Sequence, residues 1–214
     1  MGKTHIFLLG DSISLHYRPY LSDILKDEVV FSGKPGAAEA LADINNAVFG
    51  NGGDSGMVLA YLKERCAAED FPYAYLLLNC GLHDIKYNPK TKTLQVPPEM
   101  YAENLEGIVS LMKTQGVQTI FITTTPVDDK VHHAYLSING VERYNADVLS
   151  YNETAQKIMR AVGVPVIDLY TFTKALGGGT YADHVHYNDE TRRRQAAYIA
   201  DSLREILNKG AGTN

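Results

Sequence analysis

Short apolar runs alternate along this chain with longer stretches of helical period, in which apolar residues recur every three or four positions. The short runs predict strands over residues 5–9, 28–32, 73–79, 118–124 and 164–168. The longer stretches predict helices over residues 18–26, 55–69, 98–114, 146–161 and 189–207. The runs at 76–78 and 120–122 show no polar alternation, which is typical of parallel strands covered on both faces.

Strands and helices that alternate in this order favour an α/β fold, in which a parallel sheet carries helices on both faces. The chain has 214 residues and shows no internal repeat, low-complexity tract or linker. We therefore expect a single domain over residues 1–214. In such sheets, ligands bind at the carboxyl ends of the strands. The residues that directly follow each strand are the candidates for chemistry.

The charge and the apolar runs exclude several classes of protein. The 20 Lys and Arg against 25 Asp and Glu give a formal net charge of −5, which disfavours a nucleic-acid partner. No apolar run approaches the roughly 18 residues that span a bilayer, and the first run is too short for a signal peptide. Cys66 and Cys80 have the spacing of neither a metal site nor a disulfide framework. We expect a cytoplasmic protein with no membrane partner.

The first strand ends in Gly10-Asp11-Ser12, which places a serine at a strand-to-helix turn. A serine there exposes its hydroxyl group, and the amino end of the next helix favours a developing negative charge. The alternative is a tight turn in which Ser12 only caps the helix. Gly53-Asp54-Ser55 repeats these residue types after a glycine-rich loop. That loop could bring bare N–H groups to a phosphate, but it matches neither nucleotide-binding motif.

Two later segments supply histidines beside carboxylates. His83 and Asp84 follow the third strand and a glycine, which directs both towards the same cleft. The alternative is a hydrogen-bonded loop histidine, with Asp84 holding the loop. Asp183 and His186 lie three residues apart, so one turn can place the carboxylate against the imidazole and fix its tautomer. A local Asp–His hydrogen bond without a catalytic role is the alternative there.

In chain order, these four segments resemble the SGNH hydrolases, also called the GDSL esterases and lipases, over nearly the whole chain. Residues 10–12 match the first block of that family, which implies that Ser12 is the nucleophile. Gly53 falls at the glycine of the second block, which lends its backbone N–H to the oxyanion hole. Asp183 and His186 match the Asp-x-x-His of the last block. The resemblance also implies a flavodoxin-like, three-layer α/β/α sandwich with five parallel strands.

The third block departs from the family pattern. It normally reads Gly-x-Asn-Asp, whereas this chain has Gly81, Leu82, His83 and Asp84. His83 therefore replaces the asparagine that donates the third hydrogen bond to the oxyanion. An imidazole N–H can donate in the same place, so the departure concerns the strength of the oxyanion hole rather than the triad.

The remaining histidines have structural explanations. His5 begins a strand and His16 follows the serine turn, while the spacing of His184 turns it away from the Asp183 pair. Residues 128–133 hold two carboxylates and two imidazoles, His132 and His133, but their spacing fits no zinc motif. We expect residues 125–145 to form a long mobile loop beside the site. Substrate recognition there could involve Arg143, Tyr144 and Tyr151.

The resemblance implies a serine esterase that needs neither a metal nor an organic cofactor. Its implied triad is Ser12, His186 and Asp183, and its oxyanion donors are the N–H groups of Ser12 and Gly53 and the His83 side chain. The chain has no long apolar insertion and has 14 Tyr without Trp, which favours a small acyl group, such as O-acetyl on a carbohydrate. Two alternatives remain: a flavodoxin-like phosphate- or nucleotide-binding module that uses residues 50–56, and a catalytically silent relative that binds a glycan.

Overall fold

A computed structural model describes residues 2–44, 47, 49–68, 71–88, 90–135 and 141–211, without the side chains of 210 and 211. Five parallel strands form its central sheet, in the order β2-β1-β3-β6-β7. Their bounds are β1 (Thr4–Leu9), β2 (Val29–Gly33), β3 (Tyr75–Leu78), β6 (Gln118–Ile122) and β7 (Val166–Ile167). Counted along the chain, this is the 2-1-3-4-5 order of flavodoxin-like folds. The predicted α/β class and five-stranded parallel sheet are confirmed.

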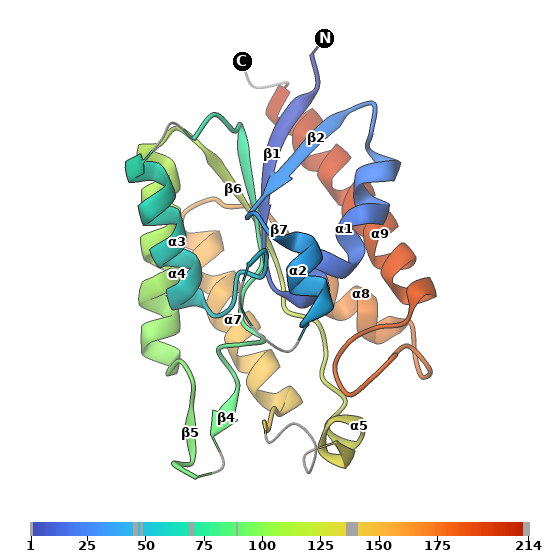
Figure 1. Ribbon diagram of the computed structural model, residues 1–214. Coiled ribbons are helices and arrows are strands. Elements are labelled where there is room, and N and C mark those ends of the chain that lie inside the picture. Colours follow the sequence, from blue (N-terminus) through green and yellow to red (C-terminus); the bar gives the residue numbers. More distant parts are fainter. Residues whose placement is uncertain are drawn as a thin grey trace.

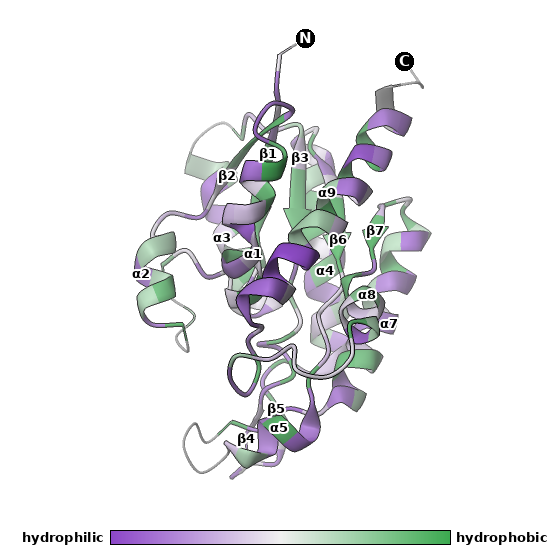
Figure 2. Ribbon diagram, turned by 90° about the vertical axis from the view of Figure 1, so that its right-hand side faces the viewer, coloured by the Kyte–Doolittle hydropathy of each residue, from purple (hydrophilic) through white to green (hydrophobic). Residues whose placement is uncertain are grey.

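Helices cover both faces of the sheet, which gives the three predicted layers (Figure 1). On one side, α1 (Ser12–Ile24) packs against α9 (Asp189–Ala211). On the other side, α3 (Ser55–Ala68), α4 (Pro98–Thr114) and α7 (Asn145–Ala161) pack side by side. Figure 2 shows apolar strands in the interior and largely polar colouring on α9. Strands β1, β3 and β6 are apolar on both faces because helices exclude water from both.

Most predicted helices agree with the structure within a few residues, but the first one starts much earlier than residue 18. Helix α1 begins at Ser12 because Asp11 caps it, with Asp11 Oδ1 accepting the Ile13 N–H at 2.9 Å. Pro19 lies inside this helix rather than in its first turn. Asp11, not Ser12, is therefore the capping residue. The predicted end of the second helix, at residue 69, lies outside the described residues, and α3 ends at Ala68.

Several short elements were not predicted, because two to seven residues are too few to show a hydrophobic period. They are α2 (Ala37–Ala42), β4 (Tyr87–Asn88), β5 (Thr93–Leu94), α5 (Asp129–Ala134) and α8 (Leu169–Ala175). The expected loop over 125–145 is wrong for α5, which Asp128 caps by accepting the Val131 N–H. Residues 136–140 of that loop lie outside the described residues.

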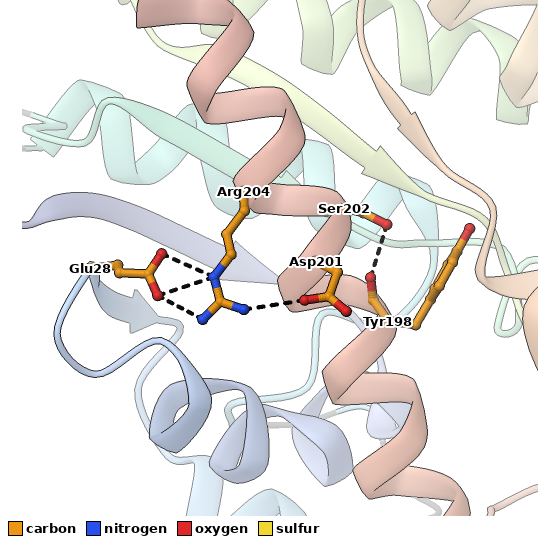
Figure 3. A network of polar contacts seen from close by, with 5 residues as sticks. All are labelled: Glu28, Tyr198, Asp201, Ser202 and Arg204. Atoms are coloured by element: carbon orange, nitrogen blue, oxygen red, sulfur yellow. Dashed lines mark hydrogen bonds and ion pairs between the residues drawn. The ribbon is translucent and has the colours of Figure 1, made fainter.

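The two ends of the sheet differ in their surroundings. Strand β1 begins and α9 ends at one end, while β4, β5 and α5 lie at the other (Figure 1). At the amino end of β2, Arg204 of α9 forms ion pairs with Glu28 and Asp201 (Figure 3). These exposed contacts join α9 to the start of β2. Among the helices of the described ranges, none combines the length and apolar character needed to cross a membrane.

Candidate active site

The sheet order creates a crevice between β1 and β3. The connections from these neighbouring strands run to opposite faces of the sheet, so the segments that follow them separate at the carboxyl edge. Ser12 directly follows β1 as the first residue of α1, and its side chain is buried. His83 follows β3 and is buried as well. The fold thus brings together two residues that the sequence placed after different strands.

Ser12, His186 and Asp183 form one hydrogen-bonded chain. Ser12 Oγ lies 2.9 Å from His186 Nε2, and His186 Nδ1 lies 2.7 Å from Asp183 Oδ2. The other carboxylate oxygen, Asp183 Oδ1, accepts the backbone N–H groups of Val185 and His186 at 2.8 and 2.7 Å. With its proton on Nδ1, the imidazole presents the lone pair of Nε2 to the serine hydroxyl. This arrangement can remove the hydroxyl proton and raise the nucleophilicity of the serine.

Partial burial of Asp183 raises its pKa, but hydrogen bonds from the His186 side chain and from backbone N–H groups outweigh burial, so its pKa lies below the ordinary value. Asp183 is therefore ionised at neutral pH. Because a carboxylate that stays ionised orients the imidazole and stabilises an imidazolium, the pair is suited to proton transfer.

The turn that carries Asp183 and His186 is fastened on both sides by tyrosines. Tyr181 and Tyr187 form a β-bridge and stack with ring centroids 4.9 Å apart. Both hydroxyl groups donate to the carbonyl oxygen of Pro126, at 2.9 and 2.7 Å. The turn is thus tied to the segment after β6, which holds the imidazole in register with Ser12.

His83 lies in the same pocket as Ser12 and His186. Burial, followed by the positive charges of Lys86 and Arg143, holds the pKa of His83 well below its ordinary value. The side chain is therefore neutral at pH 7 and carries one N–H. Its buried Nδ1 has no hydrogen-bond partner among the described residues. A neutral imidazole at this position can donate to a negatively charged oxygen beside Ser12.

The backbone N–H of Gly53 is engaged within its own loop. It donates to Asn51 Oδ1 at 2.9 Å, and Gly53 adopts a φ of 75° that favours glycine. The preceding Gly52 N–H donates to Gly10 O at 2.8 Å, which joins the glycine loop to the turn before Ser12. The structure therefore positions the loop beside the nucleophile. To donate to an oxyanion, the Gly53 N–H would have to share or give up its hydrogen bond to Asn51 Oδ1.

Two carboxylates, one from this loop and one from the loop after β3, accept backbone N–H groups at the start of α3. Asp84 Oδ1 accepts the Ser55 N–H, and Asp54 Oδ1 accepts the Met57 N–H, both at 2.9 Å. Asp84 thus ties the loop after β3 to the start of α3, as its position after His83 suggested. Burial raises the pKa of Asp84 to about 6. Occupied N–H groups and nearby carboxylates disfavour the alternative in which residues 50–56 cradle a phosphate.

Three further histidines lie near the site. His184 was expected to face away, and this prediction is wrong, because its buried side chain lines the Ser12 pocket. Its Nδ1 lies 2.9 Å from Nδ1 of His132, which is buried on α5. The ring of His16 contacts that of His186 edge-on, with centroids 5.2 Å apart. The sequence missed these contacts because α5 and the 181–187 turn meet only in three dimensions.

Arg143 also lines the pocket, although the sequence offered only a loop position for it. Its side chain is buried, with 6% of its surface exposed, and its Nε donates to Leu82 O at 2.8 Å. Of the other two candidates, Tyr151 donates to Val96 O from the buried face of α7. Tyr144 is exposed and donates to Glu142. Neither tyrosine lines the Ser12 pocket.

Within the described ranges, no group of three or more His, Cys, Asp or Glu side chains is arranged to hold a metal ion.

Comparisons with known proteins agree with this geometry. A family model described as GDSL-like lipase/acylhydrolase matches residues 6–199. A search of curated protein sequences found no match. Among solved structures, a lipase/acylhydrolase from Enterococcus faecalis is similar at 18% identity and a TM-score of 0.68, over 95% of this chain and 96% of that chain.

Two other similar structures are those of acetyl esterases. The acetyl xylan esterase AlAXEase is 15% identical with a TM-score of 0.66, over 93% of this chain and 99% of its own. The carbohydrate acetylesterase Est24 from Sinorhizobium meliloti is 14% identical with a TM-score of 0.62, over 95% of this chain and 100% of its own. At these identities, the likeness establishes the shared fold.

Proposed function

This chain belongs to the GDSL-like lipase/acylhydrolase family and is an ester hydrolase, and we propose that it uses Ser12, His186 and Asp183 as a catalytic triad. The observation that carries the proposal is the continuous hydrogen-bonded chain from Ser12 Oγ through the imidazole to Asp183, with contacts of 2.9 and 2.7 Å. In this mechanism Ser12 Oγ attacks the ester carbonyl carbon while His186 Nε2 takes its proton. Asp183 stabilises the resulting imidazolium.

The tetrahedral intermediate then collapses in the ordinary order of serine esterases. His186 gives its proton to the leaving alcohol, and the acyl group stays on Ser12 as an ester. A water molecule loses a proton to His186 and attacks that ester, which releases the acid and restores the serine. Because protons are only passed between Ser12, His186, alcohol and water, the cycle requires no metal or organic cofactor.

The proposed oxyanion donors are the N–H of Ser12, the side chain of His83 and the N–H of Gly53. Ser12 is the first residue of α1, so its N–H has no partner within the helix and lies at the positive end of the helix dipole. His83 supplies a neutral imidazole in the same pocket. Gly53 can join these donors only by exchanging its bond to Asn51. Ser12 and His83 are therefore expected to carry most of the stabilisation.

For the substrate, we propose an ester of a small acyl group, with O-acetyl carbohydrate as the leading class. The pocket beside Ser12 is small, and it is bordered by Leu82 and Val185 as well as by histidines. A small pocket favours an acetyl group over a long acyl chain. The titles of two similar structures, which name acetyl xylan and carbohydrate acetyl esterases, agree with this class.

The test uses 4-nitrophenyl acetate, with release of 4-nitrophenol as the measurement. We expect Ser12→Ala to lower kcat by at least about 10⁴-fold, because residues of a triad act as a unit. Ser150→Ala, which removes an exposed hydroxyl from α7, serves as the matched control and should retain full activity. A serine-directed fluorophosphonate should add once to the parent protein and not to Ser12→Ala. Equal rates for the parent and Ser12→Ala, with no adduct on the parent, would favour a catalytically silent glycan-binding relative.

A further inference from the structure

Arg143 is a buried cation beside the proposed nucleophile. It lines the pocket that contains Ser12 and His186, and 6% of its surface is exposed. Its Nε donates to the carbonyl oxygen of Leu82 at 2.8 Å, which fixes the plane of the guanidinium. The Nη1 and Nη2 groups, four N–H donors in all, form no hydrogen bond with the described residues. The guanidinium is thus held in place through Nε, while its Nη1 and Nη2 groups are available to a ligand.

No carboxylate among the described residues pairs with this guanidinium within the 4 Å of an ion pair. The acidic group with the clearest electrostatic effect on it is Asp11, which raises the pKa of Arg143. Asp11 is itself buried, and its carboxylate caps α1 through Ile13. Burial lowers the pKa of Arg143 to about 10, so the charge persists at neutral pH. A buried charge that has no paired carboxylate among the described residues is costly to the fold, and a bound anionic group would offset that cost.

Lys86 adds a second cation whose charge acts on His83, although it lines a different cavity from the one that contains Ser12. It follows the β3 loop and is half-buried, and its side chain forms no ion pair or hydrogen bond within the described part of the chain. Burial, followed by the charge of Arg143, lowers the pKa of Lys86 to about 8. Each of the two cations opposes protonation of His83. The carboxylates of Asp54 and Asp84 raise the pKa of Lys86, so Lys86 is partly balanced within the chain and adds only long-range positive charge beside Arg143.

We propose that Arg143, assisted by Lys86, is a specificity-determining residue that binds a carboxylate on the ester substrate, so that acidic esters are cleaved in preference to neutral ones. This inference rests on the proposed function, because it assigns a substrate class to the same pocket. For a carbohydrate ester, the class is an O-acetylated acidic sugar, whose carboxylate would accept hydrogen bonds from the open end of the guanidinium. Arg143 acts here in binding and takes no part in bond making.

The tetrahedral oxyanion is a less suitable partner for this cation. It exists only during the reaction, and the Ser12 N–H and His83 already stand beside it as donors. A carboxylate on the substrate is charged before, during and after bond cleavage. It therefore offsets the buried cation throughout the bound state, and its loss should raise KM rather than lower kcat.

The test compares an O-acetylated methyl glucuronoside with its methyl ester, in which the carboxylate is masked and the sugar unchanged. Acetate release is measured for both substrates. We expect the parent protein to favour the free acid by at least about 10-fold in kcat/KM, mostly through KM. Arg143→Gln should bring this ratio close to one, mainly through a higher KM for the free acid. Lys130→Gln, which removes an exposed cation from α5, should leave the ratio unchanged.

Further arms separate the possible outcomes. Hemisuccinate and butyrate esters of one alcohol test whether the carboxylate is recognised on the acyl side instead. If Arg143→Gln does not fold, Lys86→Gln and Arg143→Lys are measured, and each should reduce the preference for acids by at least about 3-fold.

A parent protein that shows no preference for acidic esters in either series overturns the inference. So does an equal fall in kcat for both sugars in Arg143→Gln, which would indicate an oxyanion role. Ser12-dependent cleavage of the methyl ester tests the proposed function separately.

Discussion

Arg204 and Arg143 lie near opposite ends of the same sheet and differ completely in their partners. Arg204 is partly exposed and forms hydrogen bonds with both carboxylate oxygens of Glu28 and with Asp201, as Figure 3 shows. Arg143 is buried, and the only hydrogen bond of its side chain within the described residues goes to a backbone carbonyl. Among the residues that the structure describes, the arginine that water could have solvated is paired with carboxylates, and the one that water hardly reaches is not. Stability alone would favour the reverse.

The same contrast extends to neutral polar atoms. At the carboxyl end of the sheet, four buried side-chain atoms have no partner among the described residues: His16 Nδ1, Asn51 Nδ2, His83 Nδ1 and Asp84 Oδ2. Buried polar groups are nearly always hydrogen-bonded, so unpaired atoms concentrated in one place require an explanation. A site that binds a charged group of the substrate needs hydrogen-bond donors that are not already paired within the protein. The amino end has no such task, and its charges pair with each other.

The largest effect that separates the two ends is expected from His83. His83→Ala should lower kcat on 4-nitrophenyl acetate by about 10²–10³-fold, which is the usual cost of losing one oxyanion donor. His83→Asn should retain much of the activity, because an amide N–H can donate from the same position. Since the pKa of His83 lies well below its ordinary value, this loss should be the same at pH 7 and pH 8. An alanine variant as active as the parent would remove His83 from the mechanism.

A second difference concerns the response to acid. Burial lowers the pKa of His16 and His132 to about 4, and it also lowers the pKa of His83 and His184. The unfolded chain binds protons at these positions near pH 6.5 whereas the folded chain does not, so stability falls as pH drops from about 6.5 towards 4. Burial raises the pKa of Asp11, Asp84 and Asp147, which acts in the opposite direction, but these three carboxyls are outnumbered by the four histidines together with Asp183, whose pKa is lowered.

Thermal unfolding followed by circular dichroism checks this response. Tm should be lower at pH 5 than at pH 7.5, and His16→Gln should reduce the difference, because one group that resists protonation has been removed. A Tm that is flat over this range would contradict the interpretation that the histidines around the site are buried in neutral form.

The smallest effect is expected at the amino end. Arg204→Gln should lower Tm by less than about 3 °C, because exposed ion pairs contribute little to stability and are screened by salt. Its kcat/KM on 4-nitrophenyl acetate should equal that of the parent protein, and Glu28→Gln should behave in the same way. A loss of activity of 10-fold or more in either variant would show that the two ends are coupled, and the comparison would fail.

The sequence determined the parts of this protein that depend on neighbours along the chain. The apolar runs located all five strands of the sheet to within a few residues, because a buried strand needs several consecutive apolar side chains. The Asp183-His186 spacing predicted a contact that the structure forms at 2.7 Å, since three residues make a single turn. The family blocks placed Ser12 and His83 at the ends of neighbouring strands, where parallel strands bring them together.

Only the tertiary structure decided what surrounds these residues. Arg143, His132 and His184 come from segments without a hydrophobic period. The packing of surface segments against the carboxyl edge places Arg143 and His184 in the Ser12 pocket, and His132 against His184. The occupied N–H of Gly53 was equally hidden, because its partner Asn51 is fixed by a local backbone conformation that the residue types leave open. Contacts within one turn follow from spacing. The charge and burial of a pocket depend on contacts between segments that are far apart in the sequence. A short stretch of sequence does not determine those contacts.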